Sequence, residues 1–355
     1  MTSIAYPAAS TLPSTDARAV AFWLLGVAGM VFAMAVIGAI TRLTESGLSI
    51  TEWAPVTGVI PPLNEAQWMA EFDKYRQIPE YQQINRGMSL EAFKVIYFWE
   101  WFHRLWGRLI GVAFLVPFLW FLARRRVPEG YGPRLWLLFG LGGLQGFVGW
   151  FMVQSGLVDR TDVSHYRLAM HLGLAIVIYA LLVWTAIGLL EDRRPSAWEG
   201  APRGLKIHGH VALSLLAVTI CWGAFVAGKD AGLAAADFPT VNGHWIPPEI
   251  ALAGAVGFVE NEVVLQWTHR VLATLALLGV VTLWARLRKA EIAGRLAWVV
   301  RALCVAVLAQ YALGIATIQT GVSIPVAALH QAGALVLVGL FMWALYELRG
   351  PRSAA

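Results

Sequence analysis

The sequence predicts an all-α integral membrane protein, in which eight transmembrane helices form two tandem four-helix bundles related by a pseudo-two-fold axis. Three observations support this fold class. Of the 355 residues, 58% are hydrophobic and only 14% are charged, a balance that a water-soluble fold of this size cannot easily bury. Eight apolar stretches are each near the ~20 residues that span a bilayer core. The two halves of the chain also repeat three motifs in the same order.

The eight apolar stretches follow one another along nearly the whole chain. They lie at residues 19–40, 95–123, 135–157, 168–190, 210–228, 263–285, 296–320 and 327–348. Residues 1–18 lack the Arg-rich amphipathic pattern of a transit peptide, and the span that follows is too long for a secretory signal. We therefore expect no cleaved targeting sequence.

Basic residues gather in alternate connections between these spans. They are Arg124, Arg125, Arg126 and Arg134 after the second span, Arg193, Arg194, Arg203 and Lys206 after the fourth, and Arg286, Arg288, Lys289 and Arg295 after the sixth. The positive-inside rule makes these connections and both termini cytoplasmic, in a bacterial inner membrane. The net charge of +5 thus reflects the basic cytoplasmic loops of a protein in a lipid bilayer. We therefore expect no nucleic-acid partner.

This topology divides the chain into five parts. They are a cytoplasmic N-terminal segment (1–18), an N-terminal four-helix bundle (19–190), a cytoplasmic linker (191–208), a C-terminal four-helix bundle (209–348) and a cytoplasmic tail (349–355). The only cysteines, Cys221 and Cys304, fall within predicted spans, which excludes a disulfide framework in the outer loops.

Three motifs relate the two halves. EWFHR at residues 100–104 matches QWTHR at 266–270, VQSGL at 153–157 matches IQTGV at 318–322, and LAMH at 168–171 matches AALH at 327–330. A repeated unit with an even number of spans keeps its orientation, so the bundles should be related by an axis near the membrane normal, unlike inverted transporter repeats.

Four histidines occupy matched positions in these motifs. They form two pairs, His103 with His171 and His269 with His330, all near the outer ends of their helices. Two imidazoles at one depth are what axial ligation of a haem between bundle helices requires. A zinc or copper site would need further Cys, Asp or His ligands, and hydrogen bonding between helices is the structural alternative. The remaining histidines, His165, His208, His210 and His244, fit interfacial or loop positions.

The two halves differ where Glu100 is matched by Gln266. The i, i+3 spacing puts Glu100 on nearly the same helix face as His103, where a carboxyl group can take a proton or stabilise positive charge. Pairing with Arg104, at i, i+4, is the alternative role. Arg104, Arg108 and Arg270 are candidates for binding haem propionates, although snorkelling toward the interface explains them equally well.

At these residues the chain resembles the haem A synthase family, membrane enzymes that oxidise a methyl group of haem O to the formyl group of haem A. The resemblance also includes GAITRLTESGLS at residues 38–49, then Trp53, Pro55, Gly58, Pro61 and Pro62, and QGFVGWFMVQSGL at residues 145–157. It implies that His269 and His330 hold haem b, that His103 and His171 bound the substrate haem pocket, and that Glu100 takes part in catalysis. It also implies haem O synthase and cytochrome oxidase assembly factors as partners.

The resemblance extends to one branch of that family. The outer loop here has no cysteine pair, which is typical of the proteobacterial and mitochondrial-type branch. A diheme b-type cytochrome exchanging electrons with quinone is the alternative. A transporter, the second alternative, would predict discontinuous helices and charged residues at mid-membrane, and the sequence offers neither clearly. A homo-oligomer also stays open, because small residues such as Gly140, Gly142, Gly143 and Gly146 can pack helices within or between chains.

Overall fold

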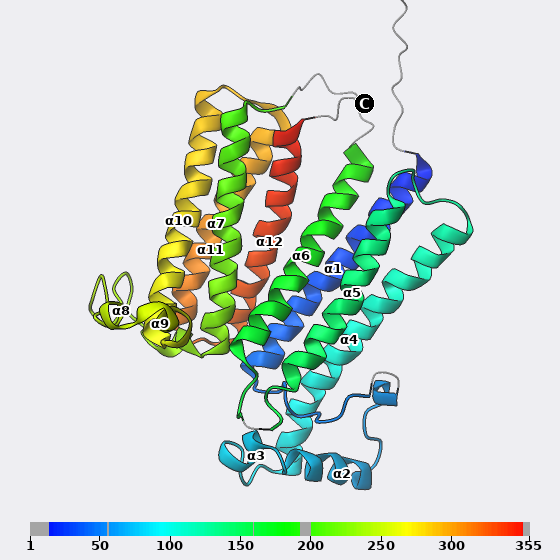
Figure 1. Ribbon diagram of the computed structural model, residues 1–355, viewed down its shortest axis with the longest axis vertical. Helices are drawn as coiled ribbons and strands as arrows, with labels where there is room; N and C mark the ends of the chain where they lie inside the picture. The colour runs from blue at the N-terminus through cyan, green and yellow to red at the C-terminus, as the bar shows by residue number, and fades with distance from the viewer. Residues whose placement is uncertain (1–13, 55–56, 159, 192–199, 351–355) are drawn as a thin grey trace, which may run out of the picture.

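The computed structural model describes residues 14–54, 57–158, 160–191 and 200–350. Within these ranges, eight helices are long and apolar enough to cross a membrane, and no β-strand is present. They are α1 (Thr15–Leu43), α4 (Leu90–Ala123), α5 (Gly132–Val153), α6 (His165–Glu191), α7 (Arg203–Gly228), α10 (Glu262–Lys289), α11 (Gly294–Gln319) and α12 (Ile324–Arg349) (Figure 1). The prediction of an all-helical chain with eight membrane-spanning helices is confirmed.

The spanning helices form two groups that lie side by side (Figure 1). In the first group α1 packs on α4 and α6, and α5 packs on α4 and α6; in the second, α7 packs on α10 and α12, and α11 packs on the same two. Between the groups α6 contacts α7, α1 contacts α12, and α6 contacts α12. Exchanging each helix with its counterpart leaves these contacts unchanged, as expected for two tandem bundles related by a pseudo-two-fold axis.

The molecule has two chemically different ends. The connections α4–α5 and α10–α11, which carry the basic residues, lie at the end where α1 begins and α12 ends, and we call this the basic end (Figure 1). The opposite end, the cap end, carries four short helices in the long connections. These are α2 (Glu65–Tyr75), α3 (Pro79–Gln83), α8 (Glu249–Leu252) and α9 (Gly254–Glu260).

Polar side chains start several of these helices, including one that hydropathy did not predict. Ser14, Asn64, Ser89 and Asn261 each accept a hydrogen bond from the backbone N–H three residues later, at the starts of α1, α2, α4 and α10. At α2 the Gln67 side chain also contributes, because it accepts from the backbone N–H of Leu63, the residue before Asn64, at 2.7 Å. This capping pattern marks the start of α2 in the sequence.

Aromatic side chains pack α2 onto the cap end of α4, and Tyr81 of α3 packs in turn on Phe72 and Tyr75 of α2. The rings of Phe72 and Phe93 lie 4.9 Å apart between centroids, and those of Tyr75 and Phe93 lie 5.3 Å apart. All three are almost fully buried. The long first connection is therefore a packed unit that holds the cap end of α4 in place.

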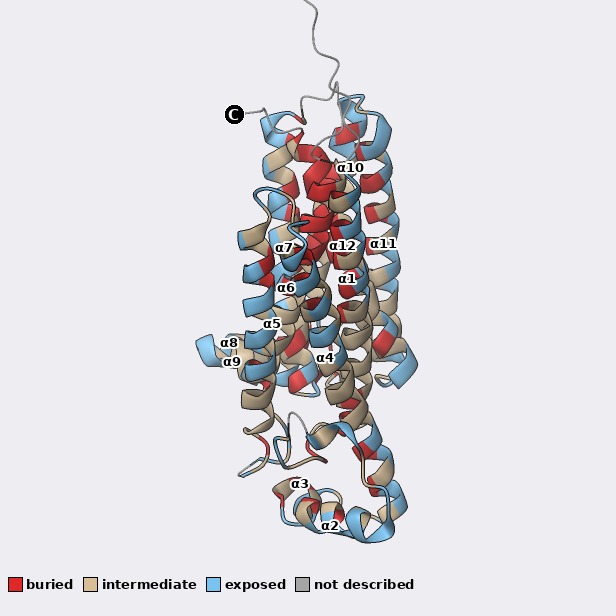
Figure 2. Cartoon of the chain, turned by 90° about the vertical axis from the view of Figure 1, so that its right-hand side faces the viewer, coloured by how far each residue is buried: buried red, intermediate tan, exposed pale blue. Residues whose placement is uncertain are grey.

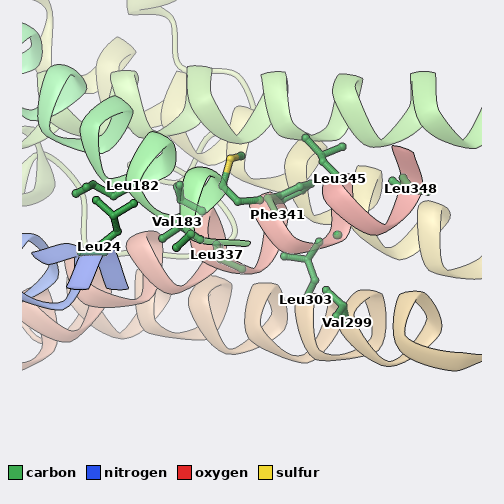
Figure 3. Packing of buried hydrophobic residues seen from close by; sticks show 14 of the residues in the cluster. Leu24, Leu182, Val183, Val299, Leu303, Leu337, Phe341, Leu345 and Leu348 are labelled. Carbon is green, nitrogen blue, oxygen red and sulfur yellow. The ribbon is translucent and has the colours of Figure 1, made fainter. Parts of the chain in front are cut away.

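The main core lies toward the basic end, where Figure 2 shows buried residues gathered around α12. Leu24 of α1, Leu182 of α6, Leu303 of α11 and Phe341 of α12 belong to one continuous cluster that crosses between the two groups of helices (Figure 3). Within a bilayer such packing stabilises by close van der Waals contact, since lipid is as apolar as leucine. The cluster joins the two groups into one body.

Polar contacts also join the groups at both ends. At the cap end, Arg42 of α1 forms an ion pair with Asp230 at 2.7 Å, and Tyr166 of α6 donates a hydrogen bond to Glu260 of α9 at 2.6 Å. At the basic end, Arg295 of α11 pairs with Glu191 of α6 at 2.8 Å. The relative position of the two groups is therefore set at the core and at each end.

Candidate functional site

Each of the four matched histidines lies against a glycine of a neighbouring helix. The pairs are His103 with Gly38 of α1, His171 with Gly149 of α5, His269 with Gly223 of α7, and His330 with Gly314 of α11. A Cβ atom on these glycines would stand 3.3, 3.0, 3.0 and 3.1 Å, respectively, from the nearest ring atom. A methyl group at these positions would crowd the ring, so glycine lets the imidazole lie this close to the neighbouring backbone without a shift.

The histidines come together as the sequence pairs them. His103 of α4 and His171 of α6 are near enough to interact electrostatically, and so are His269 of α10 and His330 of α12. All four side chains are only partly buried by protein atoms. Each pair thus presents two imidazoles between helices of one group.

This donor set fits haem better than a bare metal ion. Across the part of the chain that the structure describes, no three or more His, Cys, Asp or Glu side chains gather in a group that could hold a metal ion. Zinc and copper sites need that many protein ligands, whereas porphyrin nitrogens supply four ligands to haem iron and leave two axial positions. Two imidazoles and their facing glycines are consistent with axial ligation.

One histidine of the second pair is fixed by a backbone carbonyl. Nδ1 of His269 lies 3.1 Å from the main-chain oxygen of Thr219 on α7. Since a carbonyl oxygen only accepts, Nδ1 must carry the proton, which leaves Nε2 with a free electron pair for a metal. Its counterpart His103 makes no ring hydrogen bond to the described residues, so the two pairs are held differently.

Glu100 of α4 is enclosed by hydrogen-bond donors and is only 3% exposed. Its carboxylate accepts from Arg104 at 2.6 Å, from the hydroxyl of Ser49 at 2.8 Å and from the backbone N–H of Ile50 at 2.7 Å. The pairing with Arg104 that the i, i+4 spacing allows is therefore present. The same carboxylate also holds the segment that follows α1 against α4.

Gln266 of α10 occupies the matching position with the opposite hydrogen-bonding sense. Its amide nitrogen donates to the main-chain oxygens of Gly232 and Ala235, both at 3.0 Å, and its amide oxygen accepts from Arg270 at 3.0 Å. The segment after α1 offers donors, whereas the segment after α7 offers acceptors. The Glu100/Gln266 difference thus matches a difference in the backbone that each side chain faces.

The three arginines that the sequence marked as candidate propionate ligands donate hydrogen bonds to the segments that follow α1 and α7. Their guanidinium groups donate to main-chain oxygens: Arg104 to Ile50 and Glu52 at 2.7 and 2.8 Å, Arg108 to Ala54 at 2.9 Å, and Arg270 to Thr240, Asp237 and Ala235 at 2.6, 2.7 and 3.1 Å. These contacts position the segments over the histidine-bearing helices. The predicted contacts of Arg104 and Arg270 with haem propionates stay a prediction.

Asp237 stabilises the turn at residues 237–243, which lies in the segment to which Arg270 donates hydrogen bonds. Its carboxylate accepts from the Thr240 hydroxyl at 2.6 Å and from the backbone N–H groups of Gly243 and Asn242 at 3.0 and 2.8 Å. These bonds, that of Thr240 above all, lower the pKa of Asp237 to about 2. The side chain therefore stays ionised near neutral pH and keeps the turn closed.

A second buried carboxyl group lies in the cap. Glu80 of α3 is only 4% exposed, and Oε2 has no hydrogen-bond partner among the described residues. Burial, followed by the neighbouring charge of Glu100, raises the pKa of Glu80 to about 8. Sequence reasoning missed this residue, because α3 itself was not predicted.

The other histidines lie near groups of neighbouring segments, and neither ring nitrogen of His165 has a hydrogen-bond partner among the described residues. His165 is buried at the start of α6, 3.3 Å from Glu260, and His208 donates to the main-chain oxygen of Gly279 at 3.0 Å. The backbone of His244 pairs with that of Val241. These residues link helices and loops, as the interfacial or loop positions expected for them allow.

An apolar groove runs along α5 and α6. Its volume is about 520 Å³, and its lining consists of Leu144, Phe147, Val148, Phe151, Met170 and Leu174. Met170 directly precedes His171 in the sequence, and the side chains of Met170, Phe147 and Leu144 in this lining are exposed. An apolar chain can lie here without desolvating polar groups.

The fold and the site define a multi-pass membrane protein with two histidine pairs suited to porphyrin iron, one of them next to a buried carboxylate. A family model described as cytochrome oxidase assembly protein matches residues 21–342. The chain is 57% identical to the heme A synthase of Rhodospirillum centenum, over 99% of this chain and 95% of that one. It is 48% identical to the heme A synthase of Parvibaculum lavamentivorans, over 96% and 98%, respectively.

A third relative agrees with these two. The chain is 44% identical to the heme A synthase of Nitrosospira multiformis, over 96% of this chain and 98% of that one. The chain belongs to the haem A synthase family. These relatives are proteobacterial, in agreement with the branch that the resemblance indicated.

Proposed function

We propose that this chain makes haem A by oxidising a ring methyl group of haem O to a formyl group, and that its two halves do different work. The change from methyl and water to formyl releases four electrons and four protons. The protein must therefore pass electrons onward and accept protons beside the reacting methyl group. The observation that carries the division of labour is the buried Glu100 carboxylate beside one histidine pair and the neutral Gln266 beside the other.

In this proposal, His269 and His330 hold a permanent haem b. The hydrogen bond from Nδ1 of His269 to the Thr219 carbonyl supports this role, because it fixes the tautomer whose Nε2 can bind iron and stiffens the ring. Haem b bound there supplies one-electron transfer. The protein contributes two oriented imidazoles and a glycine behind each of them.

His103 and His171 bound the haem that reacts. A substrate must enter and a product must leave, so ligation in this half has to be reversible. The absence of a ring hydrogen bond to His103, within the described residues, fits looser ligation. The apolar groove along α5 and α6 adds a surface on which an apolar substituent of the porphyrin can lie.

Glu100 is assigned to proton acceptance or to stabilisation of positive charge at the reacting carbon. It lies one helical turn from His103, on the cap side. Arg104, Ser49 and Ile50 hold its carboxylate with three donors, so its position is set before substrate arrives. Gln266 in the other half has no group that can accept a proton in this way.

Replacing Glu100 with Gln tests this assignment. We expect purified Glu100→Gln protein to keep its haem b spectrum while the extracted haems stop at haem O or a hydroxylated intermediate. Glu91→Gln is the matched control, because Glu91 is an exposed carboxylate in the first turn of the same helix. Haem A output at the wild-type rate from Glu100→Gln would remove Glu100 from the mechanism.

The matched histidine pairs also suit the alternative function, a diheme b-type cytochrome that exchanges electrons with quinone. Haem extraction separates the two. A farnesylated, oxidised porphyrin together with haem b supports the synthase, whereas haem b at both sites supports the cytochrome. Comparing the haems before and after addition of haem O decides the matter in one preparation.

The proposed setting is a bacterial inner membrane, with both termini cytoplasmic and the histidine pairs toward the outer side. The gathering of basic loops at the end where α1 begins and α12 ends supports this orientation. Haem O synthase and cytochrome oxidase assembly factors are the proposed partners, and a homo-oligomer is the proposed assembly to test.

A further inference from the structure

Two matched glutamines lie against the histidines of α6 and α12. The amide nitrogen of Gln145 on α5 is 3.1 Å from Nδ1 of His171 and 3.1 Å from its main-chain oxygen. The amide nitrogen of Gln310 on α11 is 3.2 Å from Nδ1 of His330 and 2.8 Å from its main-chain oxygen. Each glutamine also precedes by four residues the glycine on which the same histidine rests, so one face of α5 or α11 holds the whole imidazole.

Both amide oxygens lack a partner. Oε1 of Gln145 and Oε1 of Gln310 are buried, and neither has a hydrogen bond within the described ranges. Such an acceptor is costly to leave unpaired. In the second half, Oε1 of Gln310 lies directly over Gly333, one turn beyond His330 on α12, where any side chain would displace it. The matching position in the first half is Leu174.

The hydrogen-bonding sense of these contacts matters for iron. An amide nitrogen only donates, so in the present arrangement Nδ1 of His330 accepts and its proton sits on Nε2. The amide nitrogen of Gln145 also lies 3.3 Å from Nε2 of His171, so either ring nitrogen of that histidine can accept. Ligation through Nε2 needs the opposite tautomer, with the proton on Nδ1 and an acceptor facing it. The unpaired amide oxygen of the same glutamine is that acceptor, and rotation about the last side-chain bond exchanges the two amide atoms. The rotation gives up the amide nitrogen's bond to the main-chain oxygen of the same histidine, so the side chain must also shift to move the amide oxygen away from that carbonyl.

We propose that Gln145 and Gln310 are positioning residues, whose amide oxygens accept the Nδ1 proton of His171 and His330 when Nε2 binds haem iron. The inference rests on the proposed function for the identity of the two haems. It goes further, because it gives each half a hydrogen bond that tunes the iron through the histidine. For His269 the Thr219 carbonyl accepts the Nδ1 proton. For His171 on α6 and His330 on α12, a glutamine amide that can rotate accepts it.

The second half allows a direct test in the full-length, haem-loaded protein. Gln310→Glu places a stronger acceptor on Nδ1, so the imidazole donates more charge and we expect the midpoint potential of haem b to fall. Gln310→Leu removes the acceptor, so we expect the potential to rise and haem affinity to weaken by about 10–100-fold. Gly333→Ala pushes on the amide alone and should shift the potential in the same direction as Gln310→Leu.

Gln145→Leu is the matched control, since it alters the equivalent residue of the other half and should leave the haem b potential unchanged. Opposite shifts from Gln310→Glu and Gln310→Leu are the expected result, and mere packing would not produce them. Unchanged potentials, or shifts in one direction in haem-loaded Gln310→Glu and Gly333→Ala, would overturn the proposal. His330→Ala tests the proposed function separately: if it keeps the bis-histidine haem b spectrum, the assignment of haem b to this half fails first.

Discussion

The main-chain carbonyl of Thr219 accepts a hydrogen bond from Nδ1 of His269 across 3.1 Å, between α7 and α10. Gly223, one turn further along α7, lies against the same ring. A single helix turn thus supplies both the space for this imidazole and the group that fixes its proton. The arrangement leads to the first prediction, because a methyl group on that turn must move the ring.

We expect Gly223→Ala to lower the haem b content of the purified protein by about tenfold, the size of effect seen when a ligand's supporting contact is lost. The added methyl would stand 3.0 Å from Cε1 of His269 and push the ring away from the Thr219 carbonyl. Pyridine haemochrome content per protein is the measurement. Gly26→Ala on α1, where nothing lies within 4 Å, is the control. Full occupancy with an unchanged spectrum in Gly223→Ala would contradict the prediction.

The two histidine pairs should respond differently to removal of a ligand. His269→Ala and His330→Ala should each abolish the bis-histidine haem b spectrum. His103→Ala should leave that spectrum in place and stop haem A formation, because its pair bounds the substrate. Absorption spectra and extracted haems of the three variants provide the check, and loss of haem b from His103→Ala would show that the halves are assigned wrongly.

Arg104 and Glu100 form an ion pair with little exposure to solvent, 14% and 4% for their side chains. Removing one partner leaves an unpaired buried charge, so Arg104→Leu should lower the free energy of unfolding by about 3–5 kcal/mol. The double variant Arg104→Leu, Glu100→Gln should recover part of this loss. Unfolding in detergent micelles measures both. Additive effects of the two changes would mean that the pair does not act as a unit.

The stability of the cap should depend on pH through Glu80. Burial raises its pKa from 4.5 to about 8, so between these values the folded protein holds a proton that the unfolded chain has released. Stability therefore falls as pH rises through this window. Glu80→Gln removes this dependence, and its thermal midpoint should exceed that of the wild type by more at pH 9 than at pH 5.

Thermal unfolding followed across that range tests the Glu80 prediction. Glu65→Gln, at the exposed start of α2 on the same cap, is the control and should follow the wild type. Parallel curves for Glu80→Gln and the wild type would show that ionisation of Glu80 is not linked to folding.

The sequence could predict the spans and the Glu100–Arg104 contact, because each depends on helix periodicity along one segment. The proposed histidine pairs instead came from motifs that repeat between the two halves. Hydropathy could not reveal α2 and α3, since they lie outside the spanning helices and are held by aromatic packing. The spacing of Asn64 and Gln67 is nevertheless a helix-start pattern that can be read from the sequence. The sequence could not predict which glycine lies against each histidine, for a different reason. Which residue faces which ring is decided by packing between helices, and motif matching alone does not give it.

The opposed hydrogen-bonding sense around Glu100 and Gln266 limits which side chain each half of the duplicated chain can hold at this position. A single codon change at residue 266 would set a carboxylate against the carbonyl oxygens of Gly232 and Ala235, each now 3.0 Å from the amide nitrogen. The side chain at residue 266 and the backbone that it faces are therefore matched, and exchanging the side chain alone would create an unfavourable contact.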